Sequence, residues 1–151
     1  MQVQYGLCSD IRDLMTTQST TSSSVTLWLC AVYFFSCGIS AIAAPQLWLL
    51  CAGLSAPLTP ELEIVFGVAG VYLLALGYGA ARAARAIPNN LGIIAVLIAA
   101  NLFDFLVTLK EVVVGRLPLP QGGAFLAITL VWITLLWKIF SAHHHHTEEA
   151  R

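Results

Sequence analysis

The stretch LGIIAVLIAANLFDFLVTL, residues 91–109, is apolar along nearly its whole length yet contains Asn101 and Asp104. Its nineteen residues would form a helix about 28 Å long, close to the thickness of the hydrocarbon layer of a bilayer. Its twelve Leu, Ile, Val and Phe residues favour insertion by roughly 4–7 kcal/mol, and a central Asp opposes it by about 2.5–3.5 kcal/mol. The stretch therefore predicts a membrane-spanning helix that inserts best when Asp104 faces other helices instead of lipid.

The polar side chains of this helix are predicted to share one face. A rotation of about 100° per residue aligns Asn101, Asp104, Thr108 and Glu111. One interpretation is hydrogen bonding between helices. The other is a site for a proton, a cation or a polar ligand, because a desolvated carboxylate can exchange a proton near neutral pH. We therefore treat Asn101, Asp104 and Thr108 as a candidate intramembrane polar site, and we favour hydrogen bonding because no second charge lies at that depth.

The composition places the whole chain in a membrane. Of its 151 residues, 58% are hydrophobic and 10% are charged, whereas a soluble domain usually has about 25% charged residues. The net charge of −1 gives no basis for nucleic-acid binding. All four histidines lie in the run 143–146, and no catalytic motif or metal-ligand spacing falls within an apolar stretch. We expect no enzymatic activity, no cofactor and no metal.

Three further apolar stretches complete the predicted fold. With the stretch above extended to 90–114, they are residues 25–44, 61–86 and 121–141. Together they predict an all-α, integral membrane four-helix bundle over residues 25–141. The low-complexity polar residues 1–24 are predicted to be a disordered tail, and residues 142–151 an exposed one. The piece LWLLCAGL, residues 47–54, is too short to span, so we expect an interfacial or re-entrant segment with Trp48 at the lipid headgroups.

The stretch 61–86 combines a helix start signal with a row of small residues. Thr59 and Pro60 are typical of an N-cap and a first helical position. Farther along, one side of the helix is lined by small residues that let another helix approach closely; these are Gly67, Gly70, Gly77, Ala81 and Ala84. We interpret the row as a helix-packing groove, used inside the bundle in preference to a dimer interface.

The distribution of cations predicts the orientation in the membrane. Four spans place both termini on one side, where five cations lie: Arg12, Arg82, Arg85, Lys138 and Arg151. The opposite side has two, Lys110 and Arg116. Because cytoplasmic loops carry an excess of Lys and Arg, we expect both termini in the cytoplasm.

The layout of the chain resembles a group of small bacterial membrane proteins. The first span is followed by Ala44-Pro45, the short apolar piece, Phe66-Gly67 and then LLALGYGAARAARAIPNN at residues 73–90. This layout is similar to the DoxX-like and related uncharacterised four-helix membrane proteins. The resemblance implies a four-helix bundle in a bacterial cytoplasmic membrane, and it implies no active-site residue.

Two functions fit these features. The first is a non-enzymatic accessory or scaffold protein that lies in the lipid bilayer and associates with itself or with another membrane protein. Short connections and faces of small residues favour it. The alternative is a small proton- or ion-coupled transporter that uses Asp104. Because four spans make a narrow pathway, such a transporter would be expected to act as a dimer.

Overall fold

The computed structural model describes the backbone of residues 3–53 and 57–149, and the side chains of residues 21–53 and 57–144. It contains six helical elements: α1 (Val3–Ala43), α2 (Pro45–Cys51), α3 (Pro60–Arg85), the 3-10 helix η1 (Ile87–Asn90), α4 (Leu91–Val113) and α5 (Leu119–Glu149). No strand occurs in these ranges. The predicted all-α fold is therefore confirmed.

Four of the helices are long and apolar enough to cross a membrane. They are Thr21–Ala43, Pro60–Arg85, Ile87–Val113 and Leu119–His144. The predicted four-span bundle is therefore confirmed, and its outward-facing side chains suit lipid as a solvent. Leu29, Val68 and Phe103, for example, are large apolar residues with well over a third of their surface exposed.

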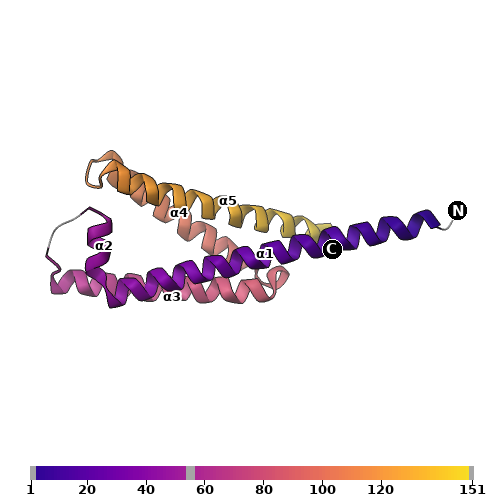
Figure 1. Ribbon diagram of the computed structural model, residues 1–151, viewed down its shortest axis with the longest axis horizontal. Helices are drawn as coiled ribbons and strands as arrows, with labels where there is room; N and C mark the ends of the chain where they lie inside the picture. The colour runs from indigo at the N-terminus through magenta and orange to yellow at the C-terminus, as the bar shows by residue number, and fades with distance from the viewer. Residues whose placement is uncertain (1–2, 54–56, 150–151) are drawn as a thin grey trace.

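The helices form two antiparallel hairpins. α1 packs mainly against α3, and α4 packs mainly against α5. Figure 1 shows the hairpins close together at the end that carries η1 and apart at the opposite end, where α2 lies. The buried core sits at the close end, where Leu27 and Phe34 of α1 meet Ala80 of α3, Ile94 and Leu97 of α4 and Leu136 of α5. The fold is thus a wedge with a packed narrow end.

The helix ends follow local chemistry with one exception. Thr59 accepts the Leu62 N–H at 3.4 Å, as the N-cap prediction requires. Gly115 has φ +77° and follows the end of α4, where Arg116 N–H donates to the Glu111 carbonyl at 2.9 Å. Asn90 precedes α4 but its side chain makes no cap there, because its Nδ2 donates back to the Ala86 carbonyl at 2.7 Å. The preceding turn η1 joins α4 directly, so no break is left for a side-chain cap.

The N-terminal region differs from the disordered tail expected for residues 1–24, because α1 is helical from Val3 onward. The packed span of α1 nucleates the helix, and each residue added on its N-terminal side then forms one further backbone hydrogen bond. Serine and threonine oppose this by less than about 0.7 kcal/mol each. Ser24 also anchors the region, since its hydroxyl donates to the Ala84 carbonyl of α3 at 2.9 Å. Residues 1–2 lie outside the described part of the chain, and the C-terminal residues 142–149 continue α5.

Candidate functional site

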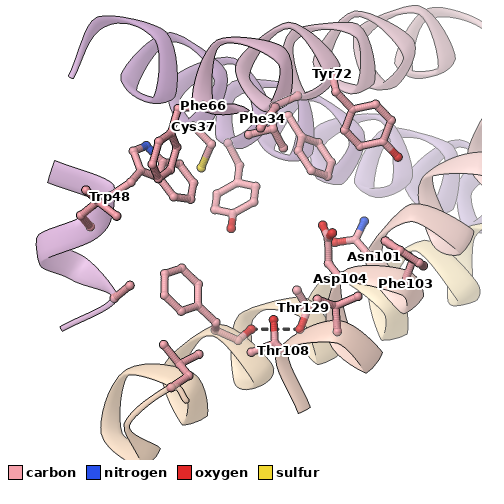
Figure 2. A pocket seen from close by; sticks show the side chains of 18 residues that line it. Phe34, Cys37, Trp48, Phe66, Tyr72, Asn101, Phe103, Asp104, Thr108 and Thr129 are labelled. Atoms are coloured by element: carbon pink, nitrogen blue, oxygen red, sulfur yellow. Dashed lines mark hydrogen bonds between the residues drawn. The ribbon is translucent and has the colours of Figure 1, made fainter. Parts of the chain in front are cut away.

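A cavity of about 430 Å³ lies between the two hairpins, in the half of the bundle away from the core. Its eighteen lining residues come from all five α-helices and from Leu117 and Ala52 in the connections. Figure 2 shows Phe34, Cys37, Phe66 and Tyr72 on one side and the α4 and α5 residues on the other, with Trp48 of α2 at one end. The cavity therefore lies at the wide part of the wedge.

The predicted polar residues lie together in this cavity. Asn101, Asp104 and Thr108 line it from α4, and Thr129 of α5 lies beside them (Figure 2). Asn101 is only 2% exposed, and its Nδ2 donates to the Leu97 carbonyl at 2.8 Å. The Thr129 hydroxyl is bonded within its own helix, to the Phe125 carbonyl at 2.9 Å. These two groups are therefore largely satisfied locally.

Asp104 is different from its neighbours. Its side chain is half-buried in the cavity wall, and among the described side chains no hydrogen bond or ion pair reaches its carboxylate. α4 runs from Leu91 to Val113, so Asp104 lies roughly 20 Å from one end of the helix and about 14 Å from the other. A carboxylate at this depth is costly unless a partner or water meets it, so the cavity is where such a partner would bind.

Glu111 does not join the cavity, although it shares the face predicted for the other three residues. Its carboxylate lies 3.5 Å from Lys110 Nζ and 3.6 Å from Arg116 Nη1, at the end of α4. These exposed pairs contribute about 0–1 kcal/mol to stability. The polar stripe is thus divided between an intramembrane group and a charged cluster at the membrane edge.

The aromatic lining was not predicted from the sequence. Seven aromatic residues line the cavity, and every α-helix supplies at least one: Tyr33, Phe34, Trp48, Phe66, Tyr72, Phe103 and Phe125. Their spacing gives no signal within any one helix, because only the tertiary arrangement brings them together.

The short helix α2 closes one end of the cavity. Trp48 was expected at the headgroups. In the structure it lines the cavity, and its Nε1–H donates to the Ser40 hydroxyl at 3.1 Å. This bond holds α2 against the end of α1, so the segment predicted to be interfacial or re-entrant is a seven-residue helix folded back on the bundle.

The residues of the predicted packing groove have different surroundings. A Cβ added at Gly70 would lie 2.8 Å from the Gly38 carbonyl, and one at Gly77 would lie 3.2 Å from the Ala31 carbonyl. Both glycines therefore lie at the contact between α1 and α3. Gly67 has no atom within 4 Å of an added Cβ, and Ala81 is half-buried against the core.

The structure and the comparisons define only a broad class. Comparisons of the chain with protein families, curated proteins and solved structures find no match. In the part of the chain that was searched, no group of three or more His, Cys, Asp and Glu residues could hold a metal ion. The four apolar helices and the cavity between them define a multi-pass, all-α membrane protein. The similarity to DoxX-like proteins stays a prediction.

Proposed function

We propose that the protein is a non-enzymatic accessory protein of the cell membrane that holds a small amphiphilic molecule between its two helical hairpins. The observation that carries this proposal is the cavity beside Asp104. Its volume of about 430 Å³ lies within the range of roughly 300–1,000 Å³ that small-molecule sites occupy. Its walls are mostly apolar with a few polar groups on one side, which is the usual construction of such sites.

Two further features support a ligand over a partner helix. Gly70 and Gly77 pack against α1 within the same chain, so this part of the groove is not open to a second protein. The lining contains no histidine, lysine or arginine, which leaves Asp104 without a neighbouring base of the kind that acid–base catalysis commonly uses.

The proposed orientation places both termini in the cytoplasm. Arg82, Arg85 and Lys138 lie at the narrow end of the bundle, and Arg85 lies 5.9 Å from the centre of the Trp28 ring. At the wide end, Lys110 and Arg116 are paired with Glu111. Among the described side chains, the three cations at the narrow end have no acidic partner. This excess supports a cytoplasmic location for that end, with the cavity in the outer half of the membrane.

Protection of Cys37 tests the proposal. Cys37 is half-buried and lines the cavity, so N-ethylmaleimide should alkylate it in protein reconstituted in lipid nanodiscs. The probes are cationic tetraphenylphosphonium, anionic tetraphenylborate and neutral N-phenyl-1-naphthylamine. At least one of them should slow the alkylation, as measured by mass spectrometry of the Cys37 peptide.

A matched pair of variants controls this measurement. Ala69→Phe fills the cavity from α3, whereas Ala75→Phe adds the same ring to an exposed position of α3 outside the cavity. Protection should be lost in Ala69→Phe and kept in Ala75→Phe. If no probe protects Cys37 in the unmodified protein, or if both variants behave alike, the proposed function is wrong.

A second candidate function is proton- or ion-coupled transport through Asp104. The observation that favours it is the unpaired Asp104 carboxylate in the cavity wall. In proteoliposomes, a pH gradient should drive movement of a bound probe, and Asp104→Asn should abolish this movement while the protein remains folded. Absence of gradient-driven movement in the unmodified protein contradicts transport and leaves simple binding.

A further inference from the structure

The charge of the cavity indicates what kind of molecule it holds. Among its lining residues, all in the described part of the chain, Asp104 is the one aspartate or glutamate, and no lysine, arginine or histidine is present. The cations nearest along the chain, Lys110 and Arg116, are both mostly exposed and paired with Glu111 at the helix end. The wall therefore offers a ligand an acidic group, which a bound cation would hold in its ionised form, and no basic group.

The other polar groups do not form a metal site. The amide of Asn101 and the hydroxyl of Thr129 donate to carbonyls of their own helices. Calcium and magnesium need about six or more oxygen ligands, and the described residues hold no cluster of three acids, cysteines or histidines. A single carboxylate among apolar side chains is better suited to an organic cation with apolar substituents than to a metal ion.

The aromatic side chains that line the cavity would contact the apolar groups of such a cation. Its seven rings come from five helices around the cavity, and Figure 2 shows Phe34 and Tyr72 across the cavity from Asp104. The faces of aromatic rings attract cations by about 0.5–2 kcal/mol each, more strongly where water is excluded. Carboxylate and rings thus favour the same charge.

We infer that the cavity binds a lipophilic organic cation, whose charge lies at Asp104 and whose apolar groups lie against the aromatic walls. This inference rests on the proposed function, because it names the chemical class of the molecule held between the hairpins. It goes further than that function, because the proposed function alone would also be met by a neutral or an anionic amphiphile.

Two ions of the same shape and opposite charge test the inference. Binding of tetraphenylphosphonium and tetraphenylborate is measured by equilibrium dialysis against protein in nanodiscs, with empty nanodiscs subtracted. The cation should bind the unmodified protein and the anion should not. Asp104→Asn should weaken cation binding about tenfold, because the phosphonium ion loses its attraction to the one carboxylate in the cavity wall. Glu111→Gln, which removes a carboxylate outside the cavity, should leave binding unchanged.

The outcomes separate this inference from the function on which it rests. If tetraphenylborate or the neutral N-phenyl-1-naphthylamine protects Cys37 as well as the cation does, the cavity is a ligand site and the cation assignment is wrong. An unchanged affinity for the cation in Asp104→Asn also overturns it. If none of the three probes protects Cys37, both proposals fail. The two ions are compared on the unmodified protein, so the inference can still be tested if the Asp104→Asn variant does not fold.

Discussion

Asp104 shows what a single residue in an apolar helix can and cannot predict. Its spacing from Asn101 and Thr108 predicted a shared face, and the three residues do line one cavity. The sequence favoured a hydrogen bond between helices, yet in the described part of the chain no partner reaches the carboxylate. Helical periodicity fixes the direction of a side chain, whereas the group that faces it depends on how the helices pack.

Gly115 allows a prediction at the same scale. Its φ of +77° lies in the left-handed region, where a side chain costs roughly 1–2 kcal/mol. Gly115→Ala should lower the free energy of unfolding in detergent by about that amount. Gly123→Ala is the control, because Gly123 lies in α5 with open space around its Cβ position; there alanine should be neutral or stabilising. Equal destabilisation by both changes would contradict the role assigned to Gly115.

At the scale of the helices, the contact between α1 and α3 depends on small residues. The small residues Gly70 and Gly77 meet the backbone of α1 at Gly38 and Ala31. The row of small residues was visible in the sequence, but not which helix it would contact. A groove of glycines accepts any helix with a complementary surface, so the identity of its partner is a property of the tertiary fold.

The glycines of α3 differ in the changes that they should tolerate. Gly70→Leu and Gly77→Leu would force side-chain atoms into α1, so each should lower the free energy of unfolding by about 1–3 kcal/mol. Gly67→Leu should have little effect, because no atom lies within 4 Å of its added Cβ. Unfolding by sodium dodecyl sulphate, followed by circular dichroism, measures all three. If Gly67→Leu is the most damaging, the α1–α3 contact is wrong.

The shape of the whole molecule follows from the sizes of its side chains. At the narrow end the buried positions include Ala80, Ala83 and Ala100, and small residues let helices approach closely. At the wide end large rings such as Phe66 and Phe125 line the space between the hairpins. The four spans and the lipid-facing surface could be predicted from hydropathy. The wedge could not, because it depends on where large and small residues from different helices meet.

The orientation of the whole molecule can be tested with its own cysteine. Cys51 is exposed at the end of α2, at the wide end of the bundle. If both termini are cytoplasmic, a membrane-impermeant maleimide should label Cys51 in intact cells. In the variant Arg151→Cys, the added C-terminal cysteine should be labelled only after the membrane is permeabilised. The reverse pattern would show that the predicted orientation is wrong.

The most direct test of the account is whether Asp104 can be reached within the membrane. N,N′-dicyclohexylcarbodiimide is a lipid-soluble reagent for carboxyl groups, and peptide mass spectrometry locates its adducts. In native membranes we expect modification of Asp104 that tetraphenylphosphonium slows and that a water-soluble carbodiimide does not reproduce. If Asp104 stays unmodified while the exposed Glu61 and Glu63 react, the carboxylate is not accessible in an intramembrane cavity and the account is contradicted.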